Sequence, residues 1–327
     1  MKIDQLDLGA FPLLLAPMED ITDSSFRQIC RGFGADLVFT EFVSSEALIR
    51  DALKSRYKLR FKDRERPIGI QIFGNEIASM EKAAQMAAEA TPELIDINFG
   101  CPVKKVAGKG AGAGLMNDVP KMIRMTEAVV RCTNLPVTVK TRLGWDDKQK
   151  NIVDIAERLQ DVGIKALTIH GRTGTQMYSG NADWTLIGEV KNNPRMHIPV
   201  IGNGDIDSPR KAVEYFDRYG VDALMIGRAA VGNPWIFSDI RTFYESGQVP
   251  PLPSVKARIE ICRMHLRNAV EEKGEIKGIL EMRRHYASYF RNLPNFKKHR
   301  LQLLTLRSLA EIESFLLELE QNPVKTL

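Results

Sequence analysis

The chain has few cysteines, and they are scattered. Cys30, Cys101, Cys132 and Cys262 include no pair spaced as Cys-x-x-Cys. A disulfide framework or a structural zinc site needs paired or clustered cysteines, so neither is expected. No second cysteine or cluster of histidines accompanies Cys101, so no bound metal is expected there either.

Long apolar runs are also missing. The segment FPLLLAPM near the start is too short to cross a bilayer and contains two prolines. No basic segment followed by an apolar run and a small-residue cleavage site begins the chain. We therefore expect a cytoplasmic protein without a membrane anchor.

An excess of one charge is absent from most of the chain. Residues 1–240 carry 31 of the 46 basic and 31 of the 41 acidic side chains, so residues 241–327 carry the remaining 15 and 10. Such an asymmetry indicates a polyanionic partner for the last quarter of the chain. The length predicts one large and one smaller domain, which we place at 1–240 and 254–327, joined by a proline-rich linker at 241–253.

Short apolar runs alternate with helical patterns throughout the first domain. The predicted strands are Leu13–Met18, Leu37–Phe42, Ile68–Phe73, Leu94–Phe99, Val137–Arg142, Ala166–Gly171, Val200–Gly204 and Ala223–Gly227. Apolar residues recur at helical spacing between them, as in Ile77–Ala90, Pro120–Cys132, Ile152–Val162 and Arg210–Tyr219. Eight strand–helix units predict an α/β fold, a parallel (β/α)8 TIM barrel. After the linker, residues 254–274, 276–291 and 299–320 predict a small all-α bundle.

Polar side chains end almost every predicted strand. They are Glu19, Asp20, Gln71, Asn98, Cys101, Lys140, Arg142, His170, Arg172, Asn203, Asp205 and Arg228. Active residues of a TIM barrel lie at these strand ends and in the loops that follow. Strands that serve structure alone do not all end in hydrogen-bonding groups, so we interpret the ring as a functional mouth.

Cys101 belongs to the most informative segment, LIDINFGCPVKKVAGKGAGAG at 94–114. Pro102 restricts Cys101 to extended backbone, and the glycines that follow make a mobile loop suited to covering a site. A buried structural cysteine is the alternative. As a functional group, the thiol could be a nucleophile, a metal ligand or a proton donor, and beside a flavin the last role fits well.

Two further groups of residues indicate a phosphorylated, flat ligand. Gly202, Gly204 and Gly227 allow close backbone approach, and Arg228 adds a charge, which favours a phosphate over glycines that merely form tight turns. Three polar side chains could hold a flat heterocycle such as a flavin, namely Gln71, Asn98 and Lys140. The alternative for Lys140 is a Schiff-base lysine whose pKa Arg142 lowers. His170 is either an orienting or protonating group or a structural histidine.

Taken together, the motifs resemble those of the tRNA-dihydrouridine synthases, in particular the DusB-like bacterial subgroup. The motifs are APMEDITD, EFVSSEAL, QIFG, DINFGCPVKKV, VKTRLGW, LTIHGRT with MYSGNADW, IGNGDI and IGRAAVGNPWIF, in order over residues 13–237. The blocks NFGCP, HGRT and GRAAxGxPW are specific to the family, whereas GNGDI recurs in other flavin barrels.

The resemblance implies a bound FMN, NADPH as reductant, and reduction of chosen uridines in tRNA to 5,6-dihydrouridine. Matched by motif, the cofactor-binding residues would be Pro17, Met18, Glu19, Gln71, Lys140, His170, Asn203, Gly204, Asp205, Gly227 and Arg228. Cys101 would protonate uracil C5 while reduced flavin N5 gives hydride to C6. Asn98, Arg142 and Arg172 would lie on the substrate side. One departure is Gly174, where many relatives carry a second arginine after HGRT. The resemblance also suggests a monomer.

The basic C-terminal segment RRHYASYFRNLPNFKKHR, residues 283–300, contains no acid. Its cations are expected to neutralise tRNA phosphates, and those we select are Arg283, Arg284, Arg291, Lys297 and Lys298. Its aromatics are expected mainly in the bundle core. The alternative for the cations is a solvated helix face without a role in binding. The target uracil would have to leave its stack to reach the barrel mouth. Two other functions stay open: a flavin barrel that reduces a free pyrimidine or enone, and a tRNA-binding protein without turnover.

Overall fold

A closed parallel barrel forms the first part of the chain. The computed structural model describes residues 1–293 and 296–321. Eight strands follow one another around the barrel in the order β3-β11-β10-β9-β8-β7-β6-β4, and a parallel bridge between Leu14 and Leu37 closes it. Their bounds are β3 Leu13–Leu15, β4 Val38–Phe39, β6 Ile68–Phe73, β7 Leu94–Asn98, β8 Val137–Arg142, β9 Ala166–His170, β10 Val200–Asn203 and β11 Ala223–Ile226. The predicted TIM barrel is confirmed.

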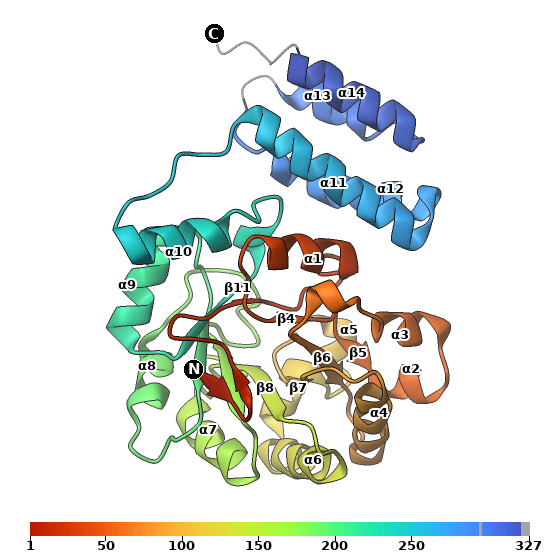
Figure 1. Ribbon diagram of the computed structural model, residues 1–327. Coiled ribbons are helices and arrows are strands. Elements are labelled where there is room, and N and C mark those ends of the chain that lie inside the picture. Colours follow the sequence, from red (N-terminus) through yellow and green to blue (C-terminus); the bar gives the residue numbers. More distant parts are fainter. Residues whose placement is uncertain (294–295, 322–327) are drawn as a thin grey trace.

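Helices surround the barrel (Figure 1). They are α1 Ser24–Gly32, α2 Ser45–Ile49, α3 Leu53–Lys58, α4 Ile77–Glu89, α5 Lys104–Ala107, α6 Val119–Cys132, α7 Ile152–Asp161, α8 Thr185–Asn192, α9 Pro209–Tyr219 and α10 Ile236–Ser246, with short 3-10 turns η1 Asp63–Glu65, η2 Gly112–Asn117 and η3 Arg228–Ala230. The strands β1 Lys2–Ile3 and β2 Leu6–Asp7 form a hairpin, and β5 Val43–Ser44 pairs with β6. The predicted helices agree with α4, α6, α7 and α9 to within one residue at each end.

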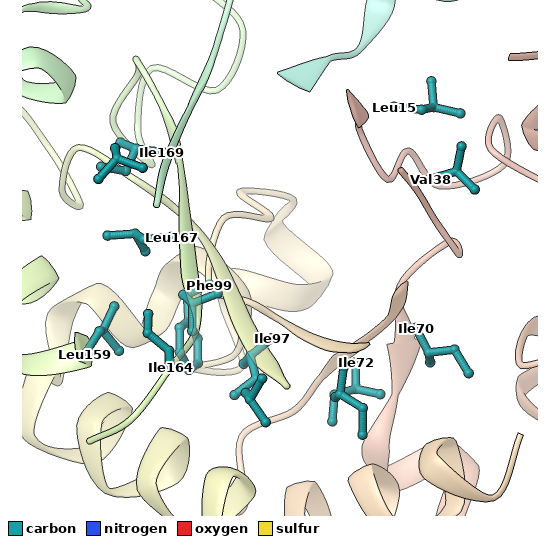
Figure 2. Close-up of a cluster of buried hydrophobic side chains, with 14 of the residues drawn as sticks. Leu15, Val38, Ile70, Ile72, Ile97, Phe99, Leu159, Ile164, Leu167 and Ile169 are labelled. Atoms are coloured by element: carbon teal, nitrogen blue, oxygen red, sulfur yellow. The ribbon is translucent and has the colours of Figure 1, made fainter. Parts of the chain in front are cut away.

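Strand alternation divides the apolar side chains into two cores. Side chains that face outward pack against the helices, as Ile70, Ile97 and Ile169 do in the larger cluster (Figure 2). Side chains that face inward form a second cluster, which contains Leu94 and Met225 and packs against the terminal hairpin residue Ile3. The hairpin therefore closes the amino-terminal end of the barrel, and the polar inward positions lie nearer the carboxyl ends of the strands.

A bundle of four helices follows: α11 Val255–Lys273, α12 Glu275–Tyr289, α13 Phe296–Leu303 and α14 Leu309–Gln321. It has a hydrophobic core of its own and lies on the side of the barrel that carries α1 and α10 (Figure 1). The helix expected over 299–320 is instead split into α13 and α14. The physical reason is a capping box, because the Ser308 hydroxyl accepts from Glu311 N–H at 3.2 Å and the Glu311 carboxylate accepts from Ser308 N–H at 3.1 Å.

The connector between the two parts is shorter than expected. Helix α10 continues to Ser246 and ends at Gly247, whose φ of 70° is left-handed, so residues 247–254 rather than 241–253 have no helix. Within the described residues, no helix combines the length and the apolar content that a membrane crossing requires.

Candidate active site

One cavity of about 730 Å³ opens at the carboxyl ends of the strands. Most of the residues expected at the mouth line it, namely Pro17, Met18, Glu19, Asn98, Cys101, Lys140, Arg142, His170, Asn203, Gly204, Asp205, Gly227 and Arg228. Arg291 of the connection after α12 also lines it. Residues more than a hundred positions apart therefore meet in one place. Gln71 and Arg172 lie outside this lining.

Strand register brings the polar side chains together. Asn98 of β7 lies opposite Lys140 of β8, and His170 of β9 lies opposite Arg142 on one side and Asn203 on the other. The Lys140 ammonium donates to Asn203 Oδ1 at 3.2 Å. Burial and the nearby charge of Arg142 lower the pKa of Lys140 to about 8, so the side chain is largely charged at neutral pH.

A chain of hydrogen bonds runs from Asp96 to the backbone of Cys101. The Gln71 amide donates from Nε2 to Asp96 Oδ2 at 2.5 Å, and its Oε1 accepts from Asn98 Nδ2 at 2.8 Å. Asn98 Oδ1 in turn accepts from the N–H groups of Gly100 and Cys101, both at 2.9 Å. An ionised carboxylate only accepts hydrogen bonds, so Asp96 determines which way both amides point and thereby holds the Cys101 loop.

Asp96 was not among the residues expected at the site. It is almost fully buried in β7, and the Thr138 hydroxyl donates to its second oxygen at 2.6 Å. Burial raises its pKa to about 6, although hydrogen bonds from Gln71 and Thr138 favour the charged form. The available signal was an acid within the otherwise apolar strand LIDIN. The same network explains the position of Gln71, which is fully buried beneath the cavity floor; direct contact of Gln71 with a cofactor stays a prediction.

Cys101 reaches the cavity from a short loop whose backbone is restrained on both sides. Its carbonyl accepts from Ala113 N–H at 3.0 Å, and Arg142 Nε donates to the carbonyl of Gly100 at 2.6 Å. Burial raises the pKa of the Cys101 thiol, although the charge of Arg142 lowers it in part. The sulfur is therefore protonated at neutral pH, which suits a proton donor rather than a thiolate nucleophile.

The opposite side of the cavity carries a network around Asp205. Its carboxylate pairs with Arg172 at 2.7 Å and with the exposed Arg228 at 3.0 Å. Although burial acts in the opposite direction, hydrogen bonds from Arg172 and Ala182 N–H hold the pKa of Asp205 below its usual range. Arg172 lies outside the cavity lining and is held by Asp205, which is part of that lining. The contact of Arg172 with substrate stays a prediction.

His170 is neutral in this surrounding. Burial, followed by the charges of Lys140 and Arg142, lowers its pKa well below the usual value. Arg172 Nη1 lies 3.3 Å from His170 Nε2. Since arginine only donates, Nε2 is the acceptor and the ring proton is on Nδ1. Gly204, which has a φ of 128°, lies so close to the ring that a Cβ there would be 3.0 Å from His170 Cδ2.

Two features of the loop after β9 were not anticipated. A Cβ on Gly174 would lie 2.9 Å from the Trp145 ring, so the indole fills the space that a longer side chain at this position would need. Tyr178 lines the cavity with half of its surface exposed. Its ring lies 5.8 Å from the Arg142 guanidinium and 5.3 Å from that of Arg228. Its place in the MYSGNADW motif was the available signal.

The cations selected in the C-terminal segment have different surroundings. Arg284 donates to the Asp20 carbonyl at 3.0 Å and ties α12 to the loop after β3. Arg283 is half-buried and donates to the Leu306 carbonyl at 3.5 Å, whereas Lys297 and Lys298 are exposed on α13. The aromatics of the segment belong to the bundle core, as expected: Tyr286, Tyr289, Phe290 and Phe296.

Carboxylates also gather beside the mouth. Oxygens of Glu19, Asp20 and Glu41 lie within 4.8 Å of one another. The Lys58 ammonium lies among them, at 2.7 Å from Glu19 and 3.8 Å from Glu41. A cation of the protein itself therefore neutralises part of this charge, and the expectation that no metal is bound stays a prediction.

Comparison with known proteins gives consistent results. The family model described as dihydrouridine synthase (Dus) matches residues 14–322. The chain is 39% identical over 317 residues to tRNA-dihydrouridine synthase B of Pseudomonas aeruginosa, covering 95% of this chain and 94% of that protein. It is 40% identical over 315 residues to tRNA-dihydrouridine synthase B of Shewanella oneidensis, covering 95% and 97%.

Solved structures share the fold. Histamine dehydrogenase from Rhizobium sp. 4-9 superposes with a TM-score of 0.56 at 12% sequence identity. The match covers 78% of this chain and 48% of that chain. At this identity the likeness concerns the barrel architecture alone.

Proposed function

Since the chain belongs to the dihydrouridine synthase family, oxidoreductases that act on tRNA, we propose that it uses bound FMN and NADPH to reduce selected uridines. The product is 5,6-dihydrouridine. The observation that carries the proposal is the position of Cys101 in the wall of the same cavity that presents Lys140 and Arg228. We also expect the enzyme to act as a monomer in the cytoplasm, where its tRNA substrate is made.

The residues around the cavity fit the chemistry of FMN. Lys140 and Asn203 offer polar groups for the pyrimidine edge of the ring, and the side chains of Pro17 and Met18 offer an apolar wall. Gly227 and Arg228 are adjacent in the cavity lining, where the Arg228 guanidinium could bind a phosphate. When bound, FMN would take hydride from NADPH and deliver it to uracil C6.

The protein supplies the proton. Cys101 Sγ–H would donate to uracil C5 as hydride reaches C6, so that one hydride and one proton are added across the double bond. The hydrogen-bond chain from Asp96 through Gln71 and Asn98 holds the Cys101 backbone, and hence the direction of the thiol, before substrate arrives. Solvent would then return a proton to the sulfur.

The base would be held by the remaining cavity groups. Arg142 and Asn98 have polar groups at the cavity, and Tyr178 offers an exposed ring beside them. A uracil inside this mouth has left the tRNA stack, so the rest of the tRNA must lie across the rim. Arg291 reaches the cavity, and Lys297 and Lys298 are exposed farther along the bundle, where phosphates could meet them.

Cys101→Ala tests the proposal. The variant should retain bound flavin but lose dihydrouridine formation by about 100-fold or more, because a positioned general acid contributes roughly that much. Dihydrouridine is measured by mass spectrometry of tRNA after reaction, with Cys132→Ala as a matched control, since Cys132 lies away from the cavity. Full activity of Cys101→Ala would remove the proton-donor role.

Two assays separate the alternative functions. Reduction of free uracil without affinity for tRNA would identify a small-molecule reductase. Salt-dependent tRNA binding with unchanged uridine mass would identify a binding protein without turnover. Mapping dihydrouridine in tRNA from cells that lack the protein would then identify the positions that it modifies.

A further inference from the structure

A second cavity adjoins the mouth and has no part in the proposed chemistry. It measures about 630 Å³ and lies between α2–α3, the end of β6 and the loop that follows Cys101. We call it the cationic cleft, because exposed cations stand on both of its walls: Arg50, Lys54, Lys105 and Lys109. It is a direct neighbour of the mouth cavity, since Glu19 and Phe42 line both.

The acids of the cationic cleft are already satisfied. Glu19 pairs with Lys58 at 2.7 Å, and Glu76 pairs with Lys121 at 3.8 Å. Glu46 accepts from Asn75 N–H at 3.0 Å and from the Ser44 hydroxyl at 3.1 Å.

The four cations of the cationic cleft differ from the acids in their partners. Over residues 1–293 and 296–321, none of the four forms an ion pair. Within the same described residues, only one lining acid, Glu46, likewise has no ion-pair partner, so unpaired cations outnumber unpaired acids by four to one. An excess of positive charge on facing walls raises the local concentration of an anion, so the cleft is suited to phosphate groups.

The floor of the cleft is apolar. Phe42 and Phe73 meet edge to face with ring centroids 5.2 Å apart, and they pack against the cluster that contains Cys101, Val106 and Ala111. Cations above an apolar floor suit a ligand that carries both a ring and phosphates. They suit a bare phosphate backbone less well.

We propose that the cationic cleft binds the adenosine phosphate half of NADPH while the nicotinamide reaches the mouth cavity. This inference rests on the proposed function. A ligand that reacts in the mouth and carries its phosphates in the cleft would span these two neighbouring cavities. The cleft is lined by residues 19–111 of the barrel alone, whereas Arg291 of the C-terminal part lines the mouth. A tRNA held by both parts of the protein would contact residues from both, so the lining favours the dinucleotide.

Charge-removing variants of the two walls test the assignment. Lys105→Gln and Arg50→Gln should each raise the NADPH concentration for half-maximal flavin reduction about tenfold, the loss expected for one charge-assisted hydrogen bond. The limiting rate should not change. The measurement is anaerobic stopped-flow reduction of the flavin-loaded protein without tRNA. Lys104→Gln is the matched control, because Lys104 is also exposed on α5 but does not line the cleft.

Binding of tRNA is measured on the same variants by filter binding and should stay within about twofold of the parent. An NADPH dependence equal to that of Lys104→Gln would overturn the assignment. A fall in tRNA affinity would also overturn it, since the cleft would then hold RNA. Chemical reduction with dithionite keeps the two hypotheses apart: dihydrouridine formation by the reduced protein tests the proposed function without any dinucleotide.

Discussion

The barrel mouth and the helical bundle use charge in opposite ways. In the mouth, Arg142 and Asp96 are almost fully buried, and both have fixed hydrogen-bond partners within the protein. In the bundle, Lys297 and Lys298 are exposed, while the neighbouring aromatics are buried. Buried charges with fixed partners suit a reaction in which atoms must be placed before the substrate arrives. Exposed cations suit a long polyanion, whose binding depends on charge more than on geometry.

The junction between the barrel and the bundle is an exception, because a charged side chain of the bundle is buried there. Lys273, at the end of α11, is almost fully buried between Asp23 and Glu281. Asp23 is also the N-cap of α1, where its side chain accepts from Phe26 N–H at 2.9 Å. A bundle residue therefore holds the helix that directly follows the loop carrying Met18 and Glu19.

Lys273→Met should have the largest effect on stability. Removing one partner of a buried pair leaves uncompensated charge, so we expect a loss of about 3–5 kcal/mol. Arg131→Gln is the control, because its pair with Glu127 on α6 is largely exposed and should contribute about 0–1 kcal/mol. Urea denaturation of both variants gives the comparison, and equal losses would show that burial at the junction does not matter.

The junction should also weaken in acid. Although burial acts in the opposite direction, the charge of Lys273 lowers the pKa of Asp23. A carboxyl whose folded pKa is lowered contributes stability above its unfolded value of about 4 and loses it as the pH falls further. The difference in unfolding free energy between parent and Lys273→Met should therefore shrink below about pH 4.

Asp96→Leu tests whether activity depends on the hydrogen-bond chain that runs from Asp96 to Cys101. Loss of the acceptor leaves the Gln71 amide unsatisfied, which costs about 1–3 kcal/mol, and we expect a fall in kcat of about 10- to 100-fold. Asp96→Asn should largely retain activity, because its oxygen can face Gln71 while its amide donates to the Thr138 hydroxyl.

A second measurement on these variants separates positioning from general damage. The rate of Cys101 alkylation by iodoacetamide should change in Asp96→Leu and return toward the parent value in Asp96→Asn. Thr138→Val is the matched control, since it removes the other hydrogen bond to Asp96 and leaves the chain from Asp96 through Gln71 intact. If Asp96→Leu keeps the parent kcat, the hydrogen-bond chain does not position Cys101.

Lys140 should make cofactor affinity depend on pH. With a pKa of about 8, its ammonium is present below that pH and is lost as the pH rises through it. FMN affinity of the flavin-free protein should therefore fall about tenfold between pH 7 and 9, since one pKa unit corresponds to about 1.4 kcal/mol. Quenching of flavin fluorescence measures it. Lys140→Arg, which stays charged, should show a flat profile; a falling profile in that variant would assign the effect to another group.

The smallest effects belong to the bundle surface. Lys297→Gln and Lys298→Gln should each weaken tRNA binding about two- to threefold and lower the slope of log Kd against log salt by about 1. Turnover at saturating tRNA should not change. Filter binding across a salt series is the measurement, and an unchanged salt slope would place the tRNA elsewhere.

Much of the barrel could be predicted because its signals are local. Apolar runs that end at Gly100, Gly171 and Gly204 mark strands whatever surrounds them, and all three occur where expected. The break between α13 and α14 also had a local signal, the Ser308–Glu311 capping box, which was overlooked.

The partners within the site could not be predicted, because they come from distant segments. The HGRT motif gave no indication that the Arg172 guanidinium pairs with Asp205, 33 residues away. Asp96 is one acid in an apolar strand until the barrel places Gln71 on one side of it and Thr138 on the other.

The sequence alone therefore determined the alternating elements, the polar strand ends and the basic C-terminal segment. These follow from periodicity and composition, which do not depend on long-range contacts. Tertiary structure decided which of the polar groups face the cavity, which stand behind it as supports, and that a cationic cleft adjoins the mouth. Closing a parallel sheet into a barrel sets the register between strands, and that register selects each neighbour.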